Sequence, residues 1–120
     1  MASVLTNSGK AGIVSVLNSG LTPFIGWGTG AGTAGITDTT LFTEVAAERA
    51  SATSSIITTT VANDTYQVVS ILTSVSGATI TNAGLFNAGT NGTLIVKGDF
   101  TGIVLAAGEK IQFTIKIQQQ

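Results

Sequence analysis

A glycine-rich run is the first candidate for a functional site. It reads Gly30-Ala-Gly32-Thr-Ala-Gly35 and matches the G-x-G-x-x-G pattern of dinucleotide-binding turns. That pattern binds pyrophosphate only where it joins a strand to a helix of a βαβ unit. Residues 41–50 could form such a helix, with Asp38 as its cap. No second helical pattern follows to cover a parallel sheet. We therefore interpret the glycines as parts of a surface loop that passes close to neighbouring backbone.

Carboxylates are the next candidates. Glu44 and Glu48 stand four residues apart and would share one face of a helix. Such a pair can hydrolyse glycosides when the two pKa values are split, a property that a sequence does not reveal. Solvated charges, with Arg49 paired to one of them, are the simpler interpretation. Asn63-Asp64 and Asp99 could donate oxygens to calcium, although no calcium-loop pattern is present and a turn explains Asn63-Asp64.

Histidine and cysteine are absent from the chain. Their absence removes the usual general base, the thiolate nucleophile and the commonest transition-metal ligands. Serine is abundant, but no histidine can activate it and no G-x-S-x-G motif occurs. We predict a chain that is not an enzyme, with no catalytic residue, no cofactor and no metal. Lysine-assisted serine chemistry and a surface calcium or glycan remain as alternatives.

The composition indicates a surface that other chains cover. Charged residues make up 9% of the 120 residues, whereas a typical domain has about 25%. The hydrophobic fraction is 43%, the mean hydropathy is +0.47 and the net charge is −1. The five basic residues are scattered, which argues against nucleic acid as a partner. The chain start does not read as a signal peptide, and no apolar run approaches the ~20 residues that span a bilayer.

The pattern along the chain is that of strands joined by turns. Residues 110–118 alternate strictly between apolar and polar side chains, which predicts a half-buried strand. Asn91-Gly92 is a strong hairpin signal. The candidate strands are residues 12–17, 24–27, 50–61, 65–75, 79–86, 93–100, 103–105 and 110–118. We predict an all-β fold, an antiparallel β-sandwich or jelly-roll-like small barrel of about eight strands. Residues 1–120 form one domain, with residues 1–20 as an N-terminal arm or edge strand.

Several strings of residues resemble a pattern that recurs in small structural proteins of tailed bacteriophages. They cover most of residues 24–117. The strings are Phe24-Ile-Gly-Trp-Gly-Thr-Gly30, Asp38-Thr-Thr-Leu-Phe-Thr-Glu44, Arg49, Asn63-Asp-Thr-Tyr-Gln-Val-Val69, Ile80-Thr-Asn-Ala-Gly-Leu-Phe86, Val96-Lys-Gly-Asp-Phe100 and Ile111-Gln-Phe-Thr-Ile-Lys116. Nothing that matches a catalytic site carries over with them.

The resemblance implies a component of the virion, made in the host cytoplasm and placed on the capsid surface. We expect a capsid decoration, or cement, protein that forms a homotrimer and binds the major capsid protein. The alternative is a tail-fibre or host-binding adhesin module. Decoration is preferred because the chain has no repetitive shaft and no coiled-coil segment. No nucleic acid and no membrane are expected as partners.

The expected contact surfaces follow from apolar and aromatic residues outside the clearest strands. An arm over Ala2 to Leu17 could add a strand to the exposed edge of a neighbour. An equal alternative makes this segment the first strand of the sandwich. The loop from Gly26 to Thr43 is the second candidate surface. The candidate interface residues are Ile13, Val14, Val16, Leu17, Phe24, Trp27, Leu41 and Phe42. Trp27, Tyr66 and the phenylalanines could instead form a sugar shelf, but core or interface positions suit them better.

Overall fold

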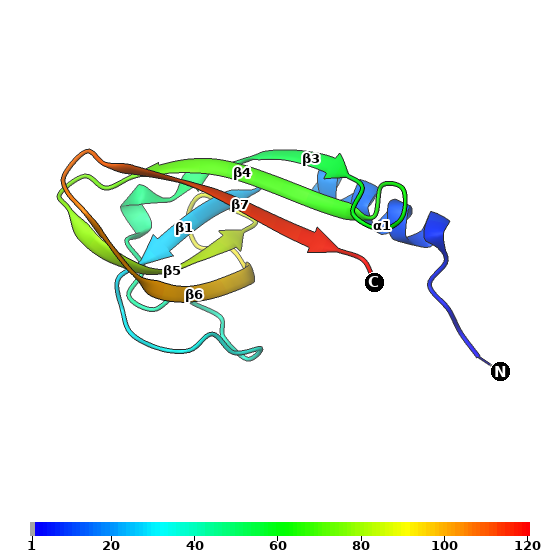
Figure 1. Cartoon of the computed structure of the whole chain (residues 1–120), viewed down its shortest axis with the longest axis horizontal. Coiled ribbons are helices and arrows are strands. Elements are labelled where there is room, and N and C mark those ends of the chain that lie inside the picture. Colours follow the sequence, from blue (N-terminus) through cyan, green and yellow to red (C-terminus); the bar gives the residue numbers. More distant parts are fainter. Residues whose placement is uncertain (1) are drawn as a thin grey trace.

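The computed structural model describes residues 2–120, which contain one α-helix and seven strands in two antiparallel sheets (Figure 1). The elements are α1 (Asn7–Gly20), β1 (Phe24–Gly28), the single 3-10 turn η1 (Ala46–Glu48), β2 (Ala50–Ser51), β3 (Thr53–Ile57), β4 (Thr65–Thr73), β5 (Ala78–Phe86), β6 (Leu94–Leu105) and β7 (Lys110–Gln118). One sheet has the order β2-β1-β5-β6 and the other β3-β4-β7. This arrangement confirms an all-β fold consistent with the predicted sandwich, with seven strands rather than eight.

The strand count differs from the prediction at three places. Residues 93–100 and 103–105, expected as two strands, belong to the single strand β6. The expected strand over residues 50–61 divides at Ala52 into β2 and β3, which belong to different sheets. The N–H of Ala52 donates to the carbonyl of Pro23 at 2.9 Å, between the two ladders. Residues 12–17 form no strand at all.

The expectation of a strand over residues 12–17 is wrong because this segment lies inside helix α1. The hydroxyl of Thr6 accepts a bond from the N–H of Gly9 at 3.0 Å and caps the helix. Val14, Leu17 and Leu21 follow each other at spacings of three and four, so they share the face that packs against β3 and β4. Fully burying one such side chain stabilises the fold by about 1.5–3 kcal/mol. Tertiary packing therefore selects the helix despite the glycines and β-branched residues of the segment.

One long side of the sandwich is closed by a strand that changes sheets. β2 pairs with β1 in the first sheet, and β3 continues directly into pairing with β4 in the second. The hydroxyl of Ser70 on β4 donates to the carbonyl of Ser51 on β2 at 2.9 Å, which fastens one sheet to the other.

The β4–β5 and β6–β7 turns, each of which passes from one sheet to the other, meet at one end of the molecule and close it as well (Figure 1). We call this end the hairpin end for its two tight reversals of the chain, although the strands they join do not pair with each other. The N–H of Ser74 donates to the carbonyl of Glu109 at 2.9 Å, and the N–H of Gly108 donates to the carbonyl of Ser74 at 2.7 Å. Gly108 has φ of +86°, a backbone conformation that favours glycine. The sheets are therefore held together at this end and along the β2–β3 side.

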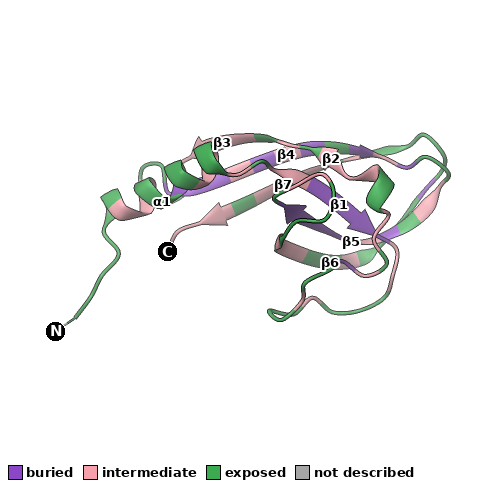
Figure 2. Cartoon of the chain, turned by 180° about the vertical axis from the view of Figure 1, so that it is seen from behind, coloured by how far each residue is buried: buried purple, intermediate pink, exposed green. Residues whose placement is uncertain are grey.

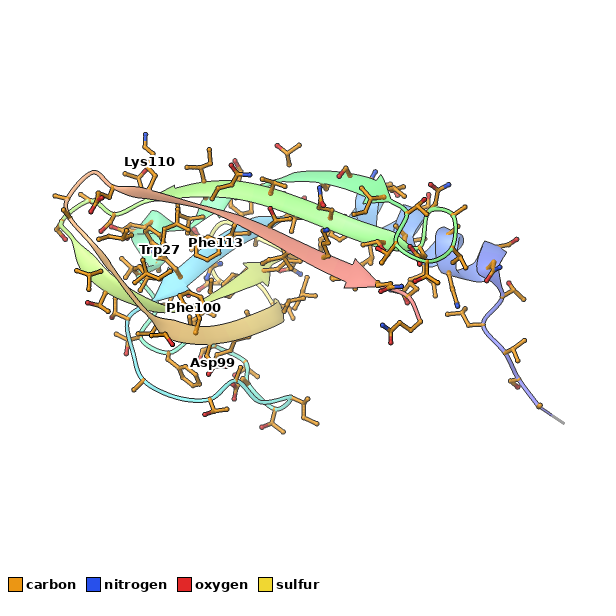
Figure 3. The ribbon with its side chains drawn as sticks, in the orientation of Figure 1. Trp27, Asp99, Phe100, Lys110 and Phe113 are labelled. Atoms are coloured by element: carbon orange, nitrogen blue, oxygen red, sulfur yellow. The ribbon has the colours of Figure 1, made fainter. Side chains whose placement is uncertain are left out.

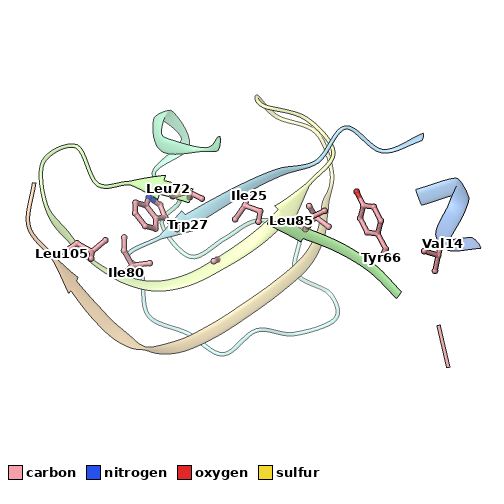
Figure 4. Close-up of a cluster of buried hydrophobic side chains, with 10 residues drawn as sticks. Val14, Ile25, Trp27, Tyr66, Leu72, Ile80, Leu85 and Leu105 are labelled. Carbon is pink, nitrogen blue, oxygen red and sulfur yellow. The ribbon is translucent and has the colours of Figure 1, made fainter. Parts of the chain in front are cut away.

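The core lies between the two sheets and runs out beneath α1 (Figure 4). Trp27, Tyr66, Ile25 and Leu72 are its largest fully buried apolar side chains. Figure 2 shows that the buried segments gather on β1, β4 and β5, whereas β6, β7 and α1 are mainly half-buried or exposed. The opposite long side of the sandwich, between the edge strands β6 and β7, is thus less well covered.

Candidate functional site

The glycine-rich run lies in the connection between β1 and η1, which crosses the outer face of the four-stranded sheet (Figure 1). A Cβ atom at Gly30 would lie 2.6 Å from Thr43 Oγ1, and one at Gly32 would lie 2.7 Å from the ring of Phe42. The chain approaches its neighbours too closely here for a side chain. Only one 3-10 turn follows the run before β2. The interpretation as a close-packed loop is confirmed, and residues 29–50 lack the helix that pyrophosphate binding requires.

Asn82 fastens this loop to the sheet. Its Oδ1 accepts from the N–H of Phe42 at 3.0 Å, and its Nδ2 donates to the carbonyl of Phe42 at 3.1 Å. The side chain of Asn82 is fully buried, so both bonds also satisfy its own polar atoms. Thr81 adds a hydroxyl bond to the carbonyl of Gly30. Sequence reasoning missed Asn82, because a buried asparagine in a strand looks like any other polar residue of an alternating pattern.

Lys97 on β6 holds the far part of the loop. Its Nζ donates to Asp38 Oδ2 at 2.9 Å and to the carbonyl of Thr40 at 2.8 Å. The same nitrogen lies 3.3 Å from the ring centroid of Phe42, a cation–π contact. The bond from Lys97, together with one from the N–H of Gly35, holds the pKa of Asp38 below its ordinary value. Both charges serve the attachment of the loop.

Arg49 is the centre of a second polar cluster, beside β1. Its guanidinium donates to both carboxylate oxygens of Glu44 at 2.9 Å and lies 3.6 Å from the ring centroid of Phe86. Nη1 also donates to the carbonyls of Ala88 at 3.0 Å and Asn91 at 2.8 Å. The predicted pairing of Arg49 with one glutamate is confirmed. The guanidinium is used to join the β5–β6 turn to the segment before η1.

Glu48 has partners of its own. Its Oε1 accepts from Trp27 Nε1 at 2.8 Å and its Oε2 accepts from the N–H of Val75 at 2.8 Å. The shared helical face imagined for Glu44 and Glu48 does not exist, because only Ala46–Glu48 are helical, in a single turn. Each carboxylate is instead bonded to a different part of the fold. The arrangement offers no acid and base facing a common space.

Asp64 organises the turn between β3 and β4. Burial would raise the pKa of this carboxyl, but the backbone N–H groups of Thr59, Val61 and Thr60 and the hydroxyl of Thr65 outweigh burial and hold it well below its usual range. The turn interpretation of Asn63-Asp64 is confirmed, and Asn63 has φ of +59°. Among residues 2–120, no group of three acidic side chains is placed to hold a metal ion.

The eight candidate interface residues divide into three groups. Val14, Trp27 and Leu41 are buried within the chain itself, with exposed fractions of 0%, 0% and 4%. Val14 and Trp27 therefore belong to the core, and Leu41, in the loop that connects β1 to η1, is buried as well, so none of the three forms part of an exposed surface. Leu17, Phe24 and Phe42 are partly buried. Ile13 and Val16 lie on the outer face of α1 and are the exposed members, at 40% and 69%.

Within residues 2–120, eight of the ten large apolar side chains that are exposed lie at the two ends of a molecule that measures 53 × 26 × 25 Å; the other two are Ile36 and Ile95. The helix end carries Val4, Leu5, Ile13 and Val16, and the hairpin end carries Ile71, Val75, Ile103 and Val104. Val104 is 78% exposed and Val75 73%. The long axis runs from α1 to the hairpin turns (Figure 1). Apolar surface of this kind is typical of sites that contact other molecules.

A third apolar surface is the seam between β6 and β7. Phe100 of β6 and Phe113 of β7 face each other there, close to Trp27 (Figure 3). The ring centroids of Phe100 and Phe113 are 6.2 Å apart, as are those of Trp27 and Phe113. A cavity of about 300 Å³ opens at this place, and Val96 and Ile115 also line it. The two edge strands thus flank a partly uncovered piece of the core.

Comparison with known proteins gives no match: no family model, no curated protein and no solved structure resembles this chain closely enough to report. Within the described residues 2–120, the single helix is too short and too polar to cross a membrane. The fold and its surfaces define the class of protein as a two-sheet all-β domain with apolar ends.

Proposed function

We propose that this chain is a non-enzymatic structural protein of a bacteriophage particle, a capsid decoration or cement protein. In this role it binds the major capsid protein and copies of itself on the capsid surface and stabilises the head. The phage assignment comes from the resemblance of residues 24–117 to small structural proteins of tailed phages. The binding role comes from the surfaces of the fold.

The observation that carries the binding role is the placement of exposed apolar side chains at both ends of the long axis. Val16 at the helix end and Val104 at the hairpin end each offer apolar surface that water covers in the isolated chain. An elongated domain with two adhesive ends can join two neighbouring subunits of a shell. Many such bridges together resist expansion or loss of subunits even where a single contact is weak.

The charged residues support a role without chemistry. Arg49, Glu44 and Glu48 bind one another or parts of the backbone and core, and Lys97 and Asp38 hold the loop. These groups stabilise the folded domain through the partners they already have. A shell clamp needs such rigidity, because a mobile domain would lose binding energy in ordering itself.

An adhesin module of a phage tail is the alternative, and one observation favours it. Ile36 lies in the loop that crosses the outer face of the four-stranded sheet, and its side chain is fully exposed. A single exposed tip on a firmly anchored loop suits contact with one host receptor. This alternative needs one contact surface, whereas the clamp needs two.

The deciding experiment uses shells of the encoding phage that were assembled without this chain. Added protein should raise their resistance to heat if it is a clamp. Val16→Asp and Val104→Asp should each abolish that gain, because either change removes one of the two contacts, while Thr101→Asp serves as an exposed control. Shells that are indifferent to the protein, together with host cells whose binding is lost in Ile36→Asp, would contradict the clamp and support the adhesin.

A further inference from the structure

The two edge strands of the open side differ in regularity. The ladder between β5 and β6 is interrupted twice, between Ile80 and Asn82 and between Leu85 and Phe86. Such bulges disturb an edge and discourage pairing with another chain. The ladder between β4 and β7 runs without interruption over nine residue pairs, from Thr65–Gln118 to Thr73–Lys110. Within residues 2–120, β7 has β4 on one side and no strand on the other.

The free backbone groups of β7 can be assigned. The N–H of Gln119 donates to the carbonyl of Asp64, and the N–H of Ser74 donates to the carbonyl of Glu109. Both residue pairs belong to the same register as the β4–β7 ladder, so odd-numbered residues of β7 bond toward β4. The N–H and C=O groups of the even-numbered residues therefore point to the open edge. These residues are Lys110, Gln112, Thr114, Lys116 and Gln118.

We propose that β7 pairs with β7 of a second copy of this chain, antiparallel and about a two-fold axis at Thr114. In this register Gln112 lies opposite Lys116 of the other copy, and Lys110 lies opposite Gln118. Every even-numbered residue then meets an even-numbered residue, so both sets of free backbone groups are satisfied. The result is one six-stranded sheet with the order β3-β4-β7-β7-β4-β3.

The side chains select this register among the two-fold alternatives. An axis at Phe113 would place Lys110 directly opposite Lys116 of the other copy, and like charges in that position destabilise a pair. An axis at Ile115 would leave the start of β7 beyond the end of its partner. The axis at Thr114 overlaps all nine residues and leaves no two lysines opposite each other.

The same register covers the seam. On the inner face it places Phe113 opposite Ile115 and Ile111 opposite Ile117 of the other copy. These four side chains are half-buried in the isolated chain, and Phe113 and Ile115 among them line the cavity of about 300 Å³. A second β7 removes their remaining apolar surface from water. The occupant is a second copy because the two-fold register places each lysine opposite a neutral glutamine and each inner apolar side chain opposite another, as an isologous contact allows.

This inference does not depend on the phage assignment, and a two-fold edge gives a dimer rather than the trimer expected from the resemblance. The test is sedimentation equilibrium of the full chain over a range of concentrations. Gln112→Glu should tighten the dimer by placing two glutamates opposite two lysines, and Gln112→Lys should weaken it. Two symmetry-related pairs predict roughly a two- to thirtyfold change in the dissociation constant in each direction. The gain in Gln112→Glu should shrink in high salt.

Matched controls use the competing edge. Thr101→Glu and Thr101→Lys, on the exposed part of the bulged strand β6, should leave the dissociation constant unchanged. Thr114→Pro removes an N–H that points to the open edge while leaving the bonds to β4, so it should give a folded monomer, with circular dichroism as the check. A chain that stays monomeric at every concentration, a trimer, or a dimer that responds equally to both Gln112 variants would overturn the proposal. A response to the Thr101 pair instead would overturn it in favour of β6.

Discussion

The two long sides of the sandwich are built differently. On the closed side, one strand passes from β2 into β3 and belongs to both sheets, and hydrogen bonds from Ser70 and Ala52 tie it in place. On the open side, β6 and β7 are edge strands of different sheets, and apart from the turn that connects them, the contacts found between them within residues 2–120 are apolar, such as that of Phe100 with Phe113. Hydrogen bonds thus tie the two sheets together along the closed side, whereas along the open side, beyond the β6–β7 turn, the two strands are held by burial of apolar surface.

The charged residues that form side-chain bonds with each other or with the core lie mainly near the closed side. Arg49, Glu44 and Glu48 all lie close to β1 and η1, next to the closed side and the core tryptophan. The open side has apolar inner side chains, and the outward polar face of β7 carries two lysines separated by neutral residues. A rigid closed side can hold the open side in shape while it contacts another molecule. Changes at Trp27, Arg49, Asp64 and Phe100 test whether the two sides differ in this way.

Trp27→Ala should give the largest loss, because Trp27 has no exposed surface and donates to Glu48. Removing the indole leaves a cavity beside Phe113 and leaves Glu48 Oε1 without its donor, so we expect the free energy of unfolding to fall by about 3–5 kcal/mol. Urea denaturation followed by circular dichroism measures it. Trp27→Phe, which keeps much of the volume and loses the donor, should lose less. Equal losses in the two variants would contradict a role for packing.

Arg49→Ala tests the polar cluster near the closed side. It removes the bidentate partner of Glu44, two bonds to carbonyl groups and the cover of Phe86, and we expect a loss of about 3 kcal/mol. Arg49→Lys is the matched control, since it keeps the charge without the planar fork. Its loss should be smaller, though clear. If Arg49→Ala had the same free energy of unfolding as the unchanged chain, the cluster would make no net contribution to stability.

The sequence predicted the fold where local pattern and tertiary structure agree. The alternation in residues 110–118 and the Asn91-Gly92 turn gave β7 and the β5–β6 hairpin, because both signals are local. Helix α1 was missed because Ile13, Val14, Val16 and Leu17 fit a strand about as well as a helix, and only packing against β3 and β4 decides between them. The predicted number of strands was one too high because residues 12–17 form a helix; the merging of two predicted strands into β6 and the division of another into β2 and β3 cancel in the count.

The sequence did not determine which of the candidate interface residues are buried and which are exposed. Low charge indicated covered exteriors, but the sequence could not assign Trp27 and Leu41 to the interior and Val104 to the surface, because which face a strand presents depends on register. That Arg49 pairs with one of the two nearby glutamates was predicted, and the structure shows that the partner is Glu44. The bonds of Asn82 to Phe42 and of Lys97 to Asp38 join residues 40 and 59 positions apart, which no local pattern reveals.

A change at Asp64 tests how the C-terminal end of β7, the edge strand of the open side, is attached to the β3–β4 turn. The carboxylate accepts from the β3–β4 turn and from Gln118 Nε2, and the carbonyl of Asp64 accepts from Gln119. Its pKa is depressed in the folded state, so its contribution is fully present above the unfolded pKa of about 4 and is lost as the pH falls below that value. The melting temperature of the unchanged chain should therefore fall between pH 5 and pH 2.

Asp64→Asn should show a weaker fall in melting temperature over the same pH range, because the amide does not titrate. At pH 7 the variant should melt at a lower temperature than the unchanged chain, and the two should converge in acid. Asp99→Asn is the control, since Asp99 is exposed and accepts only one backbone bond, at 3.3 Å. Parallel pH profiles for Asp64→Asn and the unchanged chain would show that the charge of Asp64 does not hold this turn.

Phe100→Ala should have the smallest effect, because the open side leaves Phe100 half-exposed. Truncating a half-buried ring should cost about 1–2 kcal/mol in dilute solution, well below the loss at Trp27. The cost should grow with protein concentration if a second copy covers the seam, since a change that weakens association destabilises the folded state by mass action. Thermal unfolding at several concentrations measures both quantities. If Phe100→Ala lowered the free energy of unfolding in dilute solution as much as Trp27→Ala does, Phe100 would be as fully buried as Trp27 in the single chain. The open side would then be as well packed as the closed side, which would contradict the difference between them.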